Sequence, residues 1–266
     1  MNKKIITFLM AIILVLTTIG CSTSGSKAED TITVEKGKFT VGFDDGFPPM
    51  GFIGDDGEYT GFDLELAAEV AKRLDLELVL QPISWDAKDA ELSTKTIDCI
   101  WNGFTINGRE DDYTWTKPYM KNNQVFVVRA DSDINTLDDL EGVTVMVQTD
   151  SSAEAALKDK QDLVDTFGDY LTADNYTNAL TDLEAGSVDA VAMDDVVANY
   201  QMEQRPGVFA ILDDIISMED YGVGFLLGND ELKDIVEKTL LDMAEDGFLA
   251  ETSEKWFGKD VTIIDK

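Results

Sequence analysis

Short apolar runs alternate with helical patterns along most of this chain. Residues 39–43 and 76–80 are apolar runs of the length of a strand. Between them, residues 62–74 place leucine and alanine side chains on one face and charged side chains on the other, which is typical of an amphipathic helix. Further strands are predicted at 97–101, 124–129 and 221–227. Strands that alternate with helices indicate an α/β fold.

One segment of the chain matches another. Residues 92–100 (LSTKTIDCI) match residues 183–191 (LEAGSVDAV) position by position, and each predicts a helix end, a tight turn and a buried strand. The match indicates two similarly built lobes. Asn102 and Gly103 would then end one strand where Asp194 ends the other. Because ligands of open α/β sheets collect outside the carboxyl ends of strands, we expect a cleft between two such ends.

The amino terminus predicts export. Two lysines precede an apolar run at 5–19, which is typical of a signal peptide over residues 1–20. Cys21, followed by small polar residues, resembles the cleavage and lipidation site of bacterial lipoproteins, so Cys21 is the implied lipid acceptor. An uncleaved anchor or a freely secreted chain is the alternative. Residues 21–37 lack hydrophobic periodicity and suit a flexible tether, which places the start of the fold near Lys38.

Composition excludes several functions. The chain carries 53 acidic and 21 basic side chains, a net charge of −32 that would repel nucleic acid. It has no histidine, so histidine-dependent catalysis is excluded. The acidic pairs along the chain are interpreted as solvated surface, because they lack the ligand spacing of a calcium loop. Cys99 lies in an apolar strand pattern and is expected to be a buried, inert thiol without a disulfide. We expect no metal and no cofactor.

Seven motifs, in this order, together resemble the bacterial extracellular solute-binding proteins of family 3, which serve ATP-driven importers of polar amino acids. They are GFDDGFPPM at 42–50, GFDLEL at 61–66, IDCIWNGFTI at 97–106, YTWTKPY at 113–119, VQTDSSA at 147–153, AGSVDA at 185–190 and KWFG at 255–258. The resemblance covers nearly the whole mature chain. Thr149 and Asp150 stand where many members have a glycine.

The resemblance implies an α/β, two-lobed periplasmic-binding-protein-like (type II) fold, each lobe a mixed sheet flanked by helices, with two hinge crossings. We assign 38–122 plus 219–266 to lobe 1 and 123–218 to lobe 2. The implied function is that of an extracytoplasmic substrate-binding lipoprotein, anchored to the cell membrane through Cys21. It would bind one free polar amino acid and deliver it to the permease and ATPase of an ABC importer. The protein is expected to be a monomer and not an enzyme.

Carried over residue by residue, the resemblance also implies a binding site. One group holds the α-carboxylate, and Asp194 holds the α-ammonium; an arginine fork and a carboxylate suit the two charges of a zwitterion. The carboxylate group consists of Gly103, Thr105, Arg109 and Ser151, where Ser151 also begins a helix predicted at 152–158. Two aromatic side chains, Phe47 and Trp85, are the implied walls, and Asp44, Asn102 and Gln148 are candidates to read the polar end of the ligand.

Other interpretations stay open at this point. Arg109 could pair with the acidic residues at 110–112, Asp194 could cap the helix that follows it, and Phe47 and Trp85 could be ordinary core residues. A sensor that reports to a separate receptor is one alternative function. A dehydratase with Asp44 as its acid is another. The polar candidates suggest glutamine or cystine as ligand, although Asp44 suits a basic side chain equally well.

Overall fold

The computed structural model describes residues 33–264. The expected signal peptide, Cys21 and the first part of the expected tether lie outside the described residues. Thr33 is buried, and the backbone N–H of Val34 donates to Oδ1 of Asp98 at 2.5 Å. The folded part therefore begins several residues before Lys38, where the prediction had placed its start.

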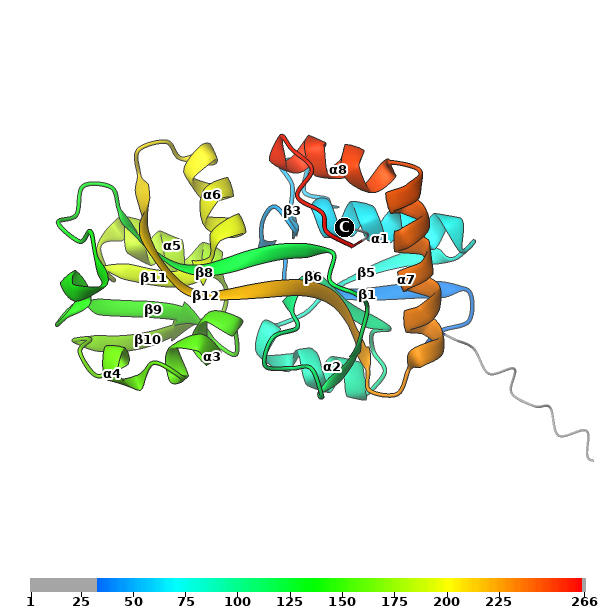
Figure 1. The fold of residues 1–266 in the computed structure, drawn as a ribbon, viewed down its shortest axis with the longest axis horizontal. Helices are drawn as coiled ribbons and strands as arrows, with labels where there is room; N and C mark the ends of the chain where they lie inside the picture. Colours follow the sequence, from blue (N-terminus) through cyan, green and yellow to red (C-terminus); the bar gives the residue numbers. More distant parts are fainter. Residues whose placement is uncertain (1–32, 265–266) are drawn as a thin grey trace, which may run out of the picture. The chain divides into compact units, whose positions relative to one another are not determined.

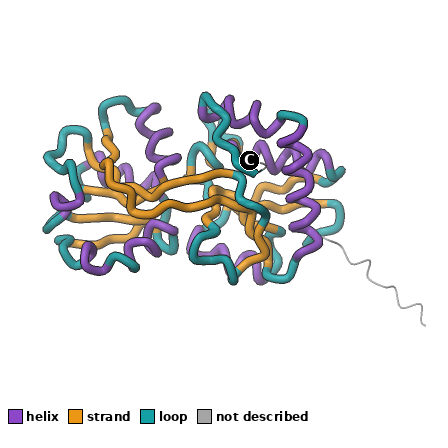
Figure 2. The backbone as a smooth tube through the Cα atoms, viewed as in Figure 1, coloured by secondary structure: helices purple, strands orange, loops and turns teal. Residues whose placement is uncertain are grey.

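Two halves, each with helices on a sheet, make up the body (Figures 1 and 2). The first half contains β1 (Lys38–Phe43), β2 (Gly46–Phe47), β3 (Gly51–Ile53), β4 (Tyr59–Thr60), α1 (Phe62–Arg73), β5 (Glu77–Pro82), the short 3-10 helix η1 (Trp85–Ala87), α2 (Lys88–Ser93), β6 (Cys99–Thr105) and β7 (Tyr113–Trp115). The chain returns to this half for α7 (Asp230–Glu245) and α8 (Phe248–Phe257).

The second half lies between two long strands, β8 (Met120–Arg129) and β12 (Phe209–Leu226). It contains η2 (Leu137–Leu140), β9 (Thr144–Gln148), α3 (Ser152–Lys158), α4 (Gln161–Val164), β10 (Asp169–Ala173), α5 (Tyr176–Ala185), β11 (Ala190–Asp194) and α6 (Asp195–Gln204). The predicted helices at 62–74 and 152–158 are confirmed, with ends at Arg73 and Lys158.

The strand order is β10-β9-β11-β8-β12-β6-β1-β5, with β7 added beside β12. In each half three parallel strands adjoin one antiparallel strand, β12 for the first half and β8 for the second. β8 and β12 pair with each other along most of their length and cross the middle of the molecule (Figure 1). The mixed sheets, flanking helices and two crossings agree with the predicted fold class. The predicted lobe boundaries, at 122/123 and 218/219, fall inside these two strands and stay a prediction.

The two matching segments have the same geometry. Lys95 and Gly186 occupy equivalent positions after α2 and α5, and both have a positive φ, 60° and 74°. Three residues later, the carboxylates of Asp98 and Asp189 accept from the backbone N–H groups of Thr40 and Thr144, at 2.7 and 3.0 Å. Each aspartate thereby fixes the start of the neighbouring parallel strand, β1 or β9. The repeat in the sequence is thus a repeat in the structure.

One strand prediction was too short. The apolar pattern covered 97–101 and Asn102 and Gly103 were expected to end the strand, whereas β6 runs from Cys99 to Thr105. Pairing with β12 extends it, because Phe104 and Thr105 lie opposite Gly222 and Tyr221. The tertiary partner, rather than local hydrophobicity, decides where this strand ends.

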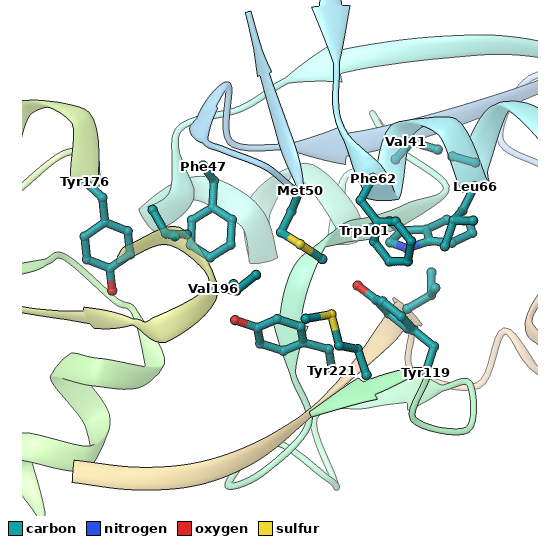
Figure 3. Packing of buried hydrophobic residues seen from close by; sticks show 14 of the residues in the cluster. Val41, Phe47, Met50, Phe62, Leu66, Trp101, Tyr119, Tyr176, Val196 and Tyr221 are labelled. Atoms are coloured by element: carbon teal, nitrogen blue, oxygen red, sulfur yellow. The ribbon is translucent and has the colours of Figure 1, made fainter. Parts of the chain in front are cut away.

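The hydrophobic core connects the two halves. The largest cluster includes Phe47 of the first half, Tyr176 of α5 and Tyr221 of β12, all less than a tenth exposed. Figure 3 shows Tyr176 beside Phe47, with Met50 and Tyr221 further along the same cluster. Cys99 is buried within it and is a free thiol, as predicted, and burial raises its pKa well above the usual value.

Candidate functional site

The carboxyl ends of the parallel strands from both halves meet at one place. Asp44 follows β1, Gln148 ends β9 and Asp194 ends β11. The side-chain amide of Gln148 donates to Oδ2 of Asp44 at 2.6 Å, which joins the two halves directly. The backbone N–H of Asp44 donates to Oδ1 of Asn102 at 3.0 Å. The three residues expected to read a polar side chain therefore form one buried, connected group.

A small pocket between the two halves adjoins this group. Every predicted site residue except Asp44 and Asn102 lines it, and Ser152 is an addition that the sequence had not indicated. The lining residues are Phe47, Trp85, Gly103, Thr105, Arg109, Gln148, Ser151, Ser152 and Asp194.

Arg109 lies between the two halves. Its guanidinium donates to the carbonyl oxygens of Thr105 and Asp150, both at 3.3 Å, and lies over the ring of Phe104. The indole N–H of Trp115 donates to the Arg109 carbonyl at 3.0 Å and holds the loop in place. Arg109 thus lies at the cavity and contacts both halves. It does not form the surface ion pair with residues 110–112 that was the alternative prediction.

Ser151 and Ser152 face Arg109 from the second half. Ser151 caps α3, since its hydroxyl accepts from the backbone N–H of Glu154 at 3.1 Å. The hydroxyl of Thr105 lies 3.2 Å from that of Ser152, which is a second contact between the halves at the cavity wall. Hydroxyl groups from both halves are therefore available to an anion beside the guanidinium.

Asp194 is almost fully buried, at 3% exposure, and its side chain does not cap α6. Three donors meet at its Oδ1: the amides of Asn122 and Gln124, both at 2.8 Å, and the hydroxyl of Tyr221 at 2.5 Å. Burial, and then the nearby carboxylate of Glu219, raise the pKa of Asp194 well above its usual range. Asp194 stands at the N-cap position of α6, but its side chain makes no capping hydrogen bond and faces these three donors instead.

The two predicted aromatic walls also belong to the core. Phe47 is 6% exposed and stacks near Tyr176 with ring centroids 5.9 Å apart, while Trp85 is 8% exposed and meets Phe104 edge-on. Gly103 lies close behind Phe47. A Cβ at Gly103 would come within 2.9 Å of that ring. Both interpretations of the aromatics therefore hold, because each side chain packs inward and still forms a cavity wall.

Lys88 and Asp150 pair beside the site, next to Trp85 and Arg109, and the sequence had not singled out Lys88. The Lys88 ammonium is buried and pairs with the carboxylate of Asp150 across the two halves. Asp150 has a φ of 58°, a left-handed conformation in which glycine is favoured and aspartate is tolerated. This explains how aspartate stands where many resembling proteins have glycine, and it gives the position a side chain that reaches Lys88.

Residues 33–264 contain no cluster of three or more histidine, cysteine or carboxylate side chains arranged to hold a metal ion. None of the helices between residues 33 and 264 combines the length and apolar character that a membrane span needs.

Comparisons with known proteins identify the family of this chain. The family model of the bacterial extracellular solute-binding proteins, family 3, matches residues 39–259. The L-cystine-binding protein TcyJ of Escherichia coli is 34% identical over 231 residues, which are 86% of this chain and 85% of that protein. The L-cystine-binding protein TcyA of Bacillus subtilis is 31% identical over 232 residues, covering 86% of this chain and 84% of that one.

A solved structure has the same architecture. An ABC uptake transporter substrate-binding protein from Streptococcus pneumoniae, with bound histidine, superposes with a TM-score of 0.81 at 34% identity and covers 85% of this chain and 94% of its own. The fold is that of the type II periplasmic binding proteins. The match of the family model over most of the body, together with these relatives, places this chain among the bacterial extracellular solute-binding proteins of family 3.

Proposed function

We propose that this protein binds one free polar amino acid in the cavity between its halves and delivers it to the permease and ATPase of an ABC importer. One observation carries the proposal. Arg109, with the hydroxyls of Thr105 and Ser151, and the carboxylate of Asp194 line a single small cavity. A free amino acid presents an anion and a cation on neighbouring atoms, so it would satisfy both ends at once.

The halves already touch around this cavity. Gln148 bonds Asp44, Thr105 bonds Ser152, and the Thr177 hydroxyl donates to the Gly46 carbonyl at 3.2 Å. Ligand contacts to both halves would stabilise this closed arrangement over an open one. A ligand shifts such an equilibrium only through its differential affinity for the two states.

We propose that the buried polar side chains of Asp44, Asn102 and Gln148 select the side chain of the ligand. Burial raises the pKa of Asp44 to about 6, so near neutral pH this carboxylate favours a hydrogen-bond donor or a cation in the ligand. Relatives are described as binding cystine, and a similar solved protein holds histidine. Glutamine and cystine are our first candidates, and a basic amino acid is the third.

The test is a thermal-shift screen of the twenty standard amino acids and L-cystine, followed by calorimetry on the strongest. A ligand at a hundredfold its dissociation constant stabilises the fold by about 2.7 kcal/mol, which such a screen detects. Arg109→Ala and Asp194→Asn should each weaken binding by well over tenfold, because removing one partner of a buried charge pair costs about 2–5 kcal/mol. Arg205→Ala, which removes an exposed pair with Glu184, is the matched control. Unchanged affinity in both site variants would refute the proposal.

Anchoring through a lipid on Cys21 is a separate part of the proposal, supported by the sequence around that cysteine. Cys21→Ala should move the protein from the membrane fraction to the soluble fraction of cells, while the purified body keeps its affinity. A Cys21→Ala protein that stays with the membrane would contradict the lipid anchor and leave the binding site unaffected.

A further inference from the structure

A second buried carboxylate lies beside Asp194. Glu219, on β12, is 5% exposed, and its Oε1 accepts from the side-chain amides of Asn122 and Gln124 at 2.5 and 2.6 Å. The same two amides donate to Oδ1 of Asp194. The two acids therefore come from different strands, β11 and β12, and share a pair of neutral donors that project from β8.

No cation within residues 33–264 compensates this pair. The ion pairs of the described residues lie elsewhere, as between Lys88 and Asp150, and none includes Asp194 or Glu219. Arg109 lines the same cavity as Asp194, but its guanidinium donates to the two carbonyl oxygens described above. Two carboxylates that are buried together resist simultaneous ionisation, because each adds its charge to a region that water does not solvate.

The other groups around the pair do not supply a charge either. From β12 the Tyr221 hydroxyl donates to Asp194, from α5 the Tyr176 hydroxyl is buried nearby, and from α3 Ser152 accepts from Gln124. From α6 the nearby Asp195 is a third acid, and its carboxylate is bonded to Asn123. The field at Asp194 is thus set by acids and neutral dipoles.

The donors around the pair are shared among several acceptors. The Gln124 amide nitrogen lies within bonding distance of three acceptors, Ser152 Oγ, Asp194 Oδ1 and Glu219 Oε1, but an amide has only two N–H bonds. Asn122 donates to both carboxylates and Tyr221 donates to Asp194, so these neutral groups, with Gln124, are the donors that the pair shares. The raised pKa of Asp194, caused by burial and by Glu219, agrees with a protonated pair.

We propose that Glu219 is a positioning residue for the ammonium-binding carboxylate Asp194, and that the pair gives up its shared proton when the ammonium group of a ligand arrives. This inference rests on the proposed function. The O–H bond of the pair breaks and its proton passes to solvent. The ligand ammonium keeps its own protons and donates one N–H···O hydrogen bond to Asp194. The ligand cation then replaces the proton as the charge that compensates the pair.

The first test needs only the unmodified protein. Calorimetry with L-cystine, or with whichever standard amino acid gives the largest thermal shift, is run at one pH in two buffers that differ in ionisation enthalpy. We expect the measured enthalpies to differ by an amount that corresponds to release of close to one proton. Equal enthalpies in the two buffers, with clear binding in both, would overturn the proton exchange and leave the proposed binding function standing. No binding of any amino acid would instead overturn the proposed function.

The second test isolates Glu219. At pH values below the raised pKa of Asp194, the affinity of the unmodified protein should rise with pH by up to about tenfold per unit, because proton loss accompanies binding. In Glu219→Gln the amide can donate to Asp194, so we expect this slope to flatten and the proton release to disappear. Asp220→Asn, which changes the adjacent acid outside the pair, should keep both. A Glu219→Gln protein that binds more weakly by the same factor at every pH, with the slope intact, would show a purely structural role and refute the inference.

Discussion

The ion pair between Lys88 and Asp150 should set how firmly the two halves close. The Lys88 side chain is 2% exposed and that of Asp150 is 52% exposed. The Lys88 ammonium also lies 3.4 Å from the carbonyl oxygens of Trp85 and Asp150, and 5.3 Å from the Trp85 ring. Lys88→Met keeps the apolar stem and removes the charge, so it tests the pair with little change of packing.

The free energy of closure that Lys88→Met is expected to lose lies between two limits. A fully buried pair that loses one partner costs about 3–5 kcal/mol, whereas an exposed pair is worth about 0–1 kcal/mol. Asp150 is half in water and can be rehydrated, so we expect about 1–2 kcal/mol in favour of opening. If closure is needed for tight binding, this corresponds to about a 5- to 30-fold weaker affinity.

Two measurements check this prediction. Calorimetry gives the affinity, and small-angle X-ray scattering of the ligand-free protein should show a larger radius of gyration for Lys88→Met. Asp150→Asn and the double variant complete a mutant cycle, in which the double variant should lose less than the sum of the single losses. Lys238→Met is the matched control, because its partner Asp242 lies on the same helix, α7. A Lys88→Met protein with unchanged affinity and unchanged radius would refute the reasoning.

Three further predictions concern buried positions at or near the site. Asp63 accepts from the backbone N–H of Gly103, and burial raises its pKa to about 7. Protonated Asp63 therefore stabilises the fold fully below the usual pKa of 3.8, and this stabilisation is lost as pH rises through about 7. The free energy of unfolding of the unmodified protein should fall over that pH range. Denaturant titrations of Asp63→Asn should show a smaller fall. Gly103→Ala should cost at least about 1–2 kcal/mol of stability by the same assay, since Gly103 has a φ of 57° and its Cβ would strike Phe47. Asp44→Asn should weaken binding of arginine or lysine more than binding of glutamine in calorimetry, and equal losses would remove Asp44 from side-chain selection.

Local signals predicted the parts of this fold that local chemistry controls. Ser151 was expected to begin a helix at 152–158, and it does, because a serine hydroxyl satisfies a free N–H of the first turn wherever that turn lies. The matched segments at 92–100 and 183–191 were found from their pattern alone. Their aspartates bond the backbone of the neighbouring strand, and because both halves make this contact, it leaves a repeated trace in the sequence.

Contacts between distant strands explain what the sequence did not reveal. Lys88 stands among acidic residues and resembles an ordinary solvated lysine, until the fold brings Asp150 across the cleft. Glu219 lies in a Met-Glu-Asp segment of an acidic protein, where a surface position is the default expectation. Nothing in the flanking residues of either indicates burial, because burial here is decided by the opposite half of the molecule.

The crossing strands nevertheless carry a signal that can be used. β8 and β12 pass through the middle of the molecule, where apolar side chains would be the simplest choice. Asn122, Gln124 and Glu219 are instead buried there, together with Asp194. Burying polar groups costs free energy unless they find partners, and Gln124 keeps its Oε1 without one among the described residues. A binding site that recovers this cost only when a ligand is present would make the ligand-free state less stable than it could be. Replacing Gln124 by leucine and Glu219 by methionine in one variant should therefore raise the melting temperature of the ligand-free protein and abolish the stabilisation by amino acid. If the melting temperature falls and the stabilisation by amino acid also disappears, the four residues serve the fold alone.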